Sequence, residues 1–216
     1  MLLAALAAPA WAQDSAVADS GIYFSLGVGG SDGGFSDSSW SQSTFTATEI
    51  FQDDFTATGV GSIGYQWMPE GYGGGLRLEL EGSYRRSPIS AYILSSGGTT
   101  TYFDADGHLE TIGVMANGFM DMNISESVTA YLGAGVGAVR ETRRDIVVDG
   151  NPITGKFTHS SAYQLMAGFG YRLSPGMIVG LDFRNMVVSD FNWPDFPATT
   201  VNIEFKEVMF MIRLVG

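Results

Sequence analysis

Residues 163–184, YQLMAGFGYRLSPGMIVGLDFR, constrain the fold more than any other part of the chain. In the first half of this stretch, every second residue from 163 to 173 is apolar or aromatic, and the residues between them are mostly small or polar. The same alternation runs from 177 to 184. Because successive side chains of a strand point to opposite faces, each half has one apolar face. Ser174-Pro175-Gly176 predicts a tight turn, with Pro fixing φ and Gly at positive φ.

The character of the second face indicates which face is inside. In a soluble β-sandwich the apolar face forms the core, and the other face carries long solvated side chains. Here the other face is mostly glycine, with a few charges of both signs. This composition fits a narrow interior in which small residues leave room for buried ion pairs. The apolar face then needs lipid as its solvent, which is the pattern of a transmembrane β-barrel strand.

Composition narrows the possible classes of protein. The formal net charge of −12 over 216 residues and the pI of about 4.3 disfavour nucleic-acid binding. The absence of cysteine excludes a disulfide scaffold and thiolate metal sites. Mean hydropathy is +0.11, yet no run of about 18 apolar residues exists, so the sequence predicts no spanning helix.

The first twelve residues, MLLAALAAPAWA, resemble the apolar core of a signal peptide with an A-x-A cleavage site. This predicts a signal peptide over 1–12, with Gln13 as the mature N-terminus and 13–20 as a flexible lead-in. The usual basic region is missing, which leaves either a start downstream of the true one or a weak signal. The alternative is a buried N-terminal helix, which Pro9 disfavours.

The rest of the chain divides into segments with the same alternation, joined by connections of two lengths. The predicted strands are 21–30, 56–67, 75–86, 108–122, 127–141, 163–173, 177–184 and 201–215. The predicted long surface loops are 31–55, 87–107, 142–158 and 188–200, the first of which could continue the strands beyond the membrane. Long and short connections alternate, as in outer-membrane barrels. We therefore predict an all-β, eight-stranded antiparallel up-and-down transmembrane β-barrel over 21–216, with both termini in the periplasm and four loops outside.

Four segments resemble one family: LRLELEGSYRR at 76–86, MANGFMDM at 115–122, YLGAGVGAV at 131–139 and AGFGYRLSPG at 167–176. They look like the small eight-stranded barrels that include the OmpA transmembrane domain, OmpX, the opacity proteins and alphaproteobacterial surface antigens. The resemblance covers about 21–216 and implies an architecture more than a function. That family usually ends on an aromatic residue read by the assembly machinery. In this chain the role would fall to Phe210, Ile212 and Leu214, and the sequence predicts no peptidoglycan-binding domain after the barrel.

The inward positions carry charges of both signs, which an eight-stranded lumen can hold only as pairs. We therefore predict a structural ion-pair network that closes the pore, rather than a proton or ion pathway. Its residues are Arg77, Glu79, Glu81, Arg85, Asp121, Arg172, Asp182, Arg184, Glu207 and Arg213.

Two further sets of residues are candidates for contacts outside the barrel. Arg86, Arg140 and Lys206 fall on outward positions at the outer strand ends, where they could bind lipopolysaccharide phosphates or simply extend into water. Aromatic residues in the predicted loops could bind a surface partner or pack on one another. These loop residues are Trp40, Phe45, Phe51, Phe191, Trp193 and Phe196.

The sequence predicts a structural or surface-interaction role, such as envelope integrity, surface antigen or adhesion, for a monomeric protein. It predicts no cofactor, no metal site and no catalysis. A lipid A-modifying enzyme using His159 and Ser161 is one alternative, but the acid that such a pair needs is not evident. A small ion-conducting porin is another. A lipocalin-like soluble barrel would need an apolar interior, which the glycine and charge pattern disfavours.

Overall fold

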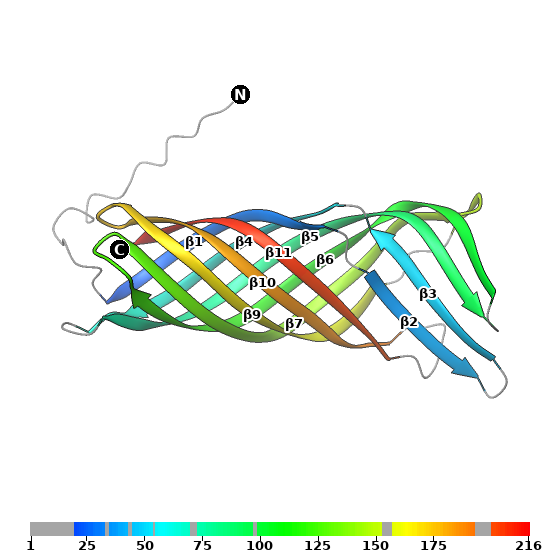
Figure 1. Ribbon diagram of the computed structural model, residues 1–216, viewed down its shortest axis with the longest axis horizontal. Coiled ribbons are helices and arrows are strands. Elements are labelled where there is room, and N and C mark those ends of the chain that lie inside the picture. Colours follow the sequence, from blue (N-terminus) through cyan, green and yellow to red (C-terminus); the bar gives the residue numbers. More distant parts are fainter. Residues whose placement is uncertain are drawn as a thin grey trace, which may run out of the picture.

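The chain forms a long closed β-barrel in the computed structural model, and part of the sheet continues well beyond the barrel at one end (Figure 1). The structure describes residues 20–32, 35–42, 45–53, 55–69, 73–96, 99–152, 157–192 and 200–216. Side chains in these ranges are described except at 31–55, 90–98, 143, 157–158 and 190–203. The predicted signal peptide and nearly all of the lead-in lie outside the described residues. No described segment forms a helix that is long and apolar enough to cross a membrane.

Within the described residues, eleven strands make up this sheet. They are β1 (Gly21–Asp32), β2 (Phe35–Gln42), β3 (Phe45–Asp53), β4 (Phe55–Trp67), β5 (Gly74–Ser96), β6 (Thr99–Asn123), β7 (Val128–Val148), β8 (Asn151–Pro152), β9 (Phe157–Ser174), β10 (Met177–Asn192) and β11 (Thr200–Val215).

Eight of these strands close the barrel. They pair antiparallel in the order β1-β4-β5-β6-β7-β9-β10-β11, and β11 pairs with β1 to complete the ring. Each strand of the ring is paired on both sides, so the barrel wall has no free edge. The predicted fold class is therefore confirmed.

The hydrogen-bond register fixes the width of the barrel. Starting at Leu76 and stepping from each residue to its partner once round the ring returns to β5 at Arg86, ten residues further along. For eight strands, this stagger gives a strand tilt of roughly 40° and a barrel radius of about 8 Å. An interior of this size is just wide enough for side chains to fill.

The barrel wall has an apolar exterior and a polar interior. Outward residues such as Leu78 (72% exposed) and Leu165 (61%) alternate with inward residues such as Arg85 and Gln66, which are fully buried. Exposure of so many large apolar side chains is tolerable only against lipid. Tyr65, Trp67 and Tyr171 are outward, half-exposed and close to the short turns; they form the aromatic girdle expected at a membrane interface.

Inward glycines make room for aromatic rings that lie against the inner wall. A Cβ at Gly64 would come within 2.5 Å of the Tyr23 ring, and one at Gly168 within 2.5 Å of the Tyr131 ring. A Cβ at Gly133 would meet the Phe119 ring at 2.4 Å. The glycine-rich face therefore accommodates rings as well as ion pairs.

Two turns have the backbone conformations that their residues favour. Gly176 has a φ of 78° in the turn between β9 and β10, as the Ser-Pro-Gly sequence predicted. Asp149 and Gly150 have φ values of 49° and 75°, and they join β7 to β8 as a two-residue hairpin loop.

The pattern of inward and outward residues inverts where the strands leave the apolar band. Within the band the outward residues are apolar, whereas beyond it the inward residues Ile89, Ala105 and Ile146 are apolar and buried. Outward residues at the same level, such as Asp104 and Arg144, are exposed. Water has replaced lipid as the outer solvent, so the inversion marks one boundary of the membrane.

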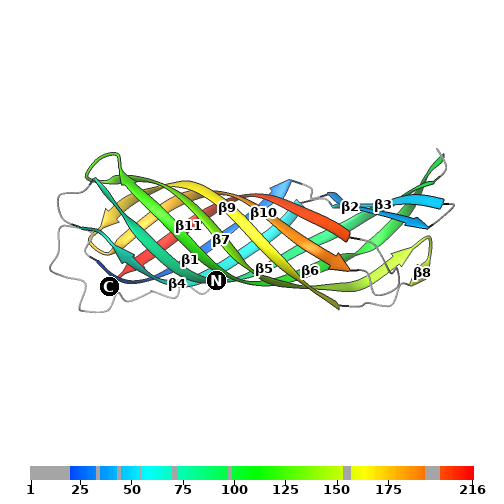
Figure 2. The ribbon, with the colours of Figure 1, turned by 90° about the horizontal axis from the view of Figure 1, so that it is seen from below.

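The predicted long loops 87–107 and 142–158 are wrong, because their described residues are largely strand. β5 and β6 pair from Ser87 opposite Leu109 to Ser96 opposite Thr99, with a register shift between Pro88 and Ala91, and β7 continues through 142–148. β2 and β3 pair antiparallel, and β3 also pairs with the extension of β5 (Figure 2). β10 continues to Asn192. With water on the outer face, these segments lack the outward apolar residues by which strands were recognised in the sequence.

Candidate functional site: a filled lumen and a charged rim

The lumen is filled by layers of side chains, the first of them near the short turns. Arg77 of β5 donates from Nε to Asp121 Oδ2 of β6 at 2.7 Å, and Arg213 Nη1 lies 3.8 Å from the same oxygen. The Arg77 guanidinium carbon is 4.1 Å from the centroid of the Phe119 ring and 4.9 Å from that of Tyr131. Ring faces stabilise a buried cation. In this layer one carboxylate pairs with two arginines, and aromatic rings pack against the Arg77 guanidinium.

The second layer is centred on Arg184 of β10. Its Nη1 donates to Glu81 Oε2 at 2.7 Å, and its Nε and Nη2 donate to Asp182 Oδ2 at 2.9 and 2.7 Å. Gln164 Nε2 donates to Asn117 Oδ1 at 2.8 Å, and Asn117 Nδ2 donates to Glu81 at 3.3 Å. Five side chains from four strands are therefore joined across the lumen.

Arg85 and Glu207 form the third layer as a two-pronged ion pair. Arg85 Nε and Nη2 donate to the two Glu207 carboxylate oxygens at 2.9 and 3.0 Å, and Nη1 donates to Ser83 at 2.8 Å. Thr58 also donates to Glu207. Both charged side chains are buried, and the paired geometry is the strongest that Arg offers a carboxylate.

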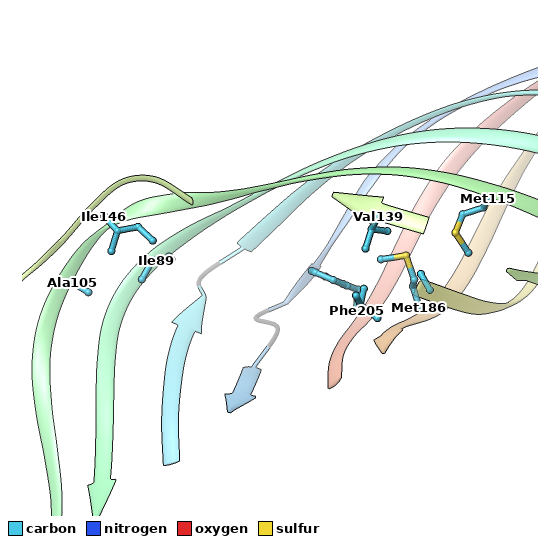
Figure 3. Packing of buried hydrophobic residues seen from close by; sticks show 9 residues of the cluster. Ile89, Ala105, Met115, Val139, Ile146, Met186 and Phe205 are labelled. Carbon is cyan, nitrogen blue, oxygen red and sulfur yellow. The ribbon is translucent and has the colours of Figure 1, made fainter. Parts of the chain in front are cut away.

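An apolar cluster lies beside Arg85 and extends toward the long hairpins. Met115, Val139, Met186 and Phe205 come from four strands and belong to one buried cluster, in which Figure 3 shows them gathered together. The Phe205 ring centroid is 5.6 Å from the Arg85 guanidinium. Near the short turns, a cavity of about 20 Å³ remains beside Arg77 and Asp182, room for about one water molecule.

Nine of the ten predicted lumen residues lie in these layers or beside them. Glu79 differs from the others, because it accepts hydrogen bonds from the Tyr23 hydroxyl at 2.9 Å and Asn117 at 3.3 Å and forms no ion pair with the described residues. Arg172 does not belong to the network: it is only partly buried, at the short-turn end, and forms no ion pair in the described part of the chain. The prediction missed Glu141, which is also buried.

Arg86, Arg140 and Lys206 are exposed at the end of the apolar band, but the structure does not bring all three together. Arg86 lies on β5 and Arg140 on β7, with β6 between them. Lys206 lies on β11, with two strands between it and either β5 or β7, and its Nζ is 3.5 Å from Glu204 Oε1. The predicted trio is therefore a pair on one face and a single residue on the other.

The neighbours of Arg86 and Arg140 were not recognised as a group in the sequence. Glu110 of β6 lies between the two strands and accepts from Arg144 Nε at 3.1 Å and from the Tyr84 hydroxyl at 3.2 Å. His108 Nε2 is 3.6 Å from Glu110. No residue spacing within one strand could have indicated this cluster, because it depends on the register between strands.

His159 and Ser161 are both exposed on β9, as the alternation predicted. The register places Arg140 opposite His159, and Ala138 and Ser189 opposite Ser161. A catalytic histidine of this kind works with a carboxylate, and the cross-strand neighbour of His159 on β7 is an arginine.

The aromatic candidates in the hairpins are located by their backbone alone. Trp40 is in β2, Phe45 and Phe51 are in β3, and Phe191 is in β10. Trp193 and Phe196 lie outside the described residues. Across the described part of the chain, no group of three or more His, Asp or Glu side chains is placed to hold a metal ion.

A closed antiparallel barrel with a lipid-compatible exterior and a polar, filled interior defines the class of integral outer-membrane β-barrels. The family described as "Outer membrane protein beta-barrel domain" matches residues 1–206, so the chain belongs to that family. Its place is therefore the outer membrane of a Gram-negative bacterium, where its outer wall contacts membrane lipid.

Individual relatives agree with the family. An "Outer membrane protein" of Gluconacetobacter diazotrophicus is 25% identical over 96% of this chain, and the chain spans about half (51%) of that protein's length. The outer membrane protein OprG of Pseudomonas aeruginosa matches with a TM-score of 0.51 and 14% identity, over 93% of this chain and 98% of OprG. The outer membrane protease OmpT of Escherichia coli also matches with a TM-score of 0.51, at 8% identity, over 95% of this chain and 100% of OmpT. At these identities the two structures are alike in fold alone.

Proposed function

We propose that this protein is a non-conducting outer-membrane barrel that acts at the cell surface through its long hairpins, in envelope integrity, as a surface antigen or in adhesion. The observation that carries this proposal is the length of the strands beyond the apolar band. β5 and β6 stay paired from Ser87 opposite Leu109 to Ser96 opposite Thr99, and β2 and β3 widen the sheet there. These extended strands are not needed to close the barrel, whose lumen is already filled by buried ion pairs. We therefore assign the function to the hairpins.

The orientation that this function needs follows from the lengths of the connections. Outer-membrane barrels keep short turns in the periplasm and long loops outside. The turns 175–176 and 124–127 are short, and the long hairpins all lie at the opposite end. We therefore place the hairpins at the cell surface and the C-terminus in the periplasm.

Neither alternative activity is favoured by the contacts of the described residues. A porin would need an open lumen at the level of Arg184 and Phe205, where buried side chains lie. The cross-strand neighbour of His159 on β7 is Arg140, which cannot serve as the acid of a catalytic set. The matching protease is alike in fold alone. We propose that the protein is not an enzyme and conducts no steady current.

A hairpin-shortened variant tests this function. Replacing residues 90–105 with an Asn-Gly turn should leave the barrel folded in the membrane, because none of the ring pairs below Ile89 is touched. In a deletion strain, the parent should restore surface adhesion or detergent resistance, and the variant should not. Full restoration by the variant would show that the hairpins do not carry the function.

The orientation has its own control. A cysteine introduced at Thr100 should react with an impermeant maleimide on intact cells, and one at Pro175 should react only after the outer membrane is opened. The reverse pattern would put the hairpins in the periplasm and reject the proposal.

A further inference from the structure

The positive charges of this acidic protein are unevenly distributed. Of its eleven Lys and Arg residues, Arg77, Arg85, Arg184 and Arg213 are buried in the lumen, and Arg172 lies at the short-turn end. Among the remaining cations whose side chains are described, three lie on β5 and β7 at one side of the long-hairpin end, and Lys206 lies across the barrel. In a chain with a net charge of −12, this local excess is a specific feature of one face.

The register brings these cations into one cluster. Arg86 is opposite Glu110, Arg140 is opposite His159, and Arg144 is one strand from Glu110 on β7. Side chains directly opposite each other on neighbouring strands are about 5 Å apart at Cβ, and diagonal neighbours are about 7–8 Å apart. Glu110 accepts from Arg144 Nε at 3.1 Å. The outward positions Arg86, Glu110, Arg140 and Arg144 therefore carry three guanidinium groups and one carboxylate.

The cluster lies at the membrane boundary. Tyr84 and Ile112 are outward apolar residues of β5 and β6, at 44% and 54% exposed, and Arg86 and Glu110 are the next outward positions. The buried Ile89, three residues beyond Arg86, already belongs to the region in water. A charge at this height is at the level of lipid headgroups.

We propose that Arg86 and Arg140, with His159 beside them, bind the phosphates of a glycolipid headgroup in the outer leaflet, which is the chemistry of lipopolysaccharide. Arg can hold a phosphate through two parallel hydrogen bonds, and the low exposure to water at the interface strengthens such contacts. Glu110 acts as a positioning residue, because it holds Arg144 beside the site and sets the spacing of the cations. Lys206 is outside the site.

The inference rests on the orientation in the proposed function, because phosphorylated glycolipid lies in the outer leaflet. Refolding the protein into bilayers with the glycolipid in both leaflets measures binding at the site whichever way the barrel is inserted. Failure of binding and failure of orientation are therefore separate results, the second being read by the cysteine labels at 100 and 175.

The experiment compares Arg86→Gln/Arg140→Gln with Arg172→Gln/Lys206→Gln, a control that removes the same charge from other places. Each full-length chain is refolded into bilayers that contain equal amounts of bisphosphorylated and dephosphorylated lipid A. The lipid retained by the protein after extraction is counted by native mass spectrometry, and heat-modifiable gel mobility confirms folding. We expect the parent and the control to prefer the phosphorylated lipid by about tenfold, and the Arg86/Arg140 variant to lose that preference.

Three results would overturn the proposal. The first is the same lipid preference in all chains. The second is the same loss of preference in the control variant, which would indicate an effect of net charge alone. The third is displacement of the lipid by equimolar inorganic pyrophosphate, which would indicate a site for soluble anions.

Discussion

Arg184→Met is expected to destabilise the barrel by about 3–5 kcal/mol, the cost of leaving a buried charge without its partner. Arg184 is nearly inaccessible and donates to both Glu81 and Asp182. Its removal leaves two carboxylates in the lumen with no guanidinium between them. The measurement is urea unfolding in lipid vesicles, followed by tryptophan fluorescence.

Two further variants make this result specific. Lys206→Met removes an exposed cation whose contact with Glu204 is 3.5 Å long, and it should change the unfolding free energy by less than about 1 kcal/mol. Adding Glu81→Gln and Asp182→Asn to Arg184→Met should recover most of the loss, because the stranded charges are then neutral. A loss below about 1 kcal/mol in Arg184→Met would mean that water reaches this layer.

Gly168→Ala is expected to cost about 1–3 kcal/mol, which is typical of overpacking. Its Cβ would lie 2.4 Å from the Leu181 carbonyl oxygen and 2.5 Å from the Tyr131 ring, and the carbonyl cannot move without disturbing the β9–β10 ladder. Tyr131 in turn packs edge-on against Phe119, with ring centroids 5.9 Å apart. One methyl group therefore disturbs the first layer of the lumen.

Gly59→Ala is the matched control for this change. A Cβ at Gly59 has no atom within 4 Å, so this variant should be neutral or slightly stabilising through the lower entropy of the unfolded chain. The same vesicle unfolding experiment compares the two. Equal effects at the two positions would contradict the close packing of the inner wall.

The strands that cross the membrane could be predicted because lipid outside and ion pairs inside impose opposite demands on alternate residues. The outward positions of Leu78, Tyr65 and Phe169 and the inward positions of Arg77 and Asp182 all followed from that alternation. The extensions of β5 and β6 could not be predicted in the same way. Water on their outer face allows Thr and Asp there, and such a sequence looks like a loop.

The pairing of charges could not be predicted, because it depends on how the ring closes. Arg85 pairs with Glu207 from the far end of the chain, and nothing within either strand indicates that partner. The same reason explains why Lys206 was grouped with Arg86 and Arg140. Its outward position was correctly expected, but the order of strands round the ring separates it from the other two. Arg172 was assigned to the lumen by parity alone, although it lies where the barrel ends.

We infer that the ion-pair layers and the apolar cluster around Met186 and Phe205 close the lumen. Planar-bilayer recording of the purified monomer tests this inference. We predict no steady conductance steps from the parent chain across a range of voltages. Large, steady steps from the monomer, scaling with salt concentration, would contradict a closed lumen and favour a porin.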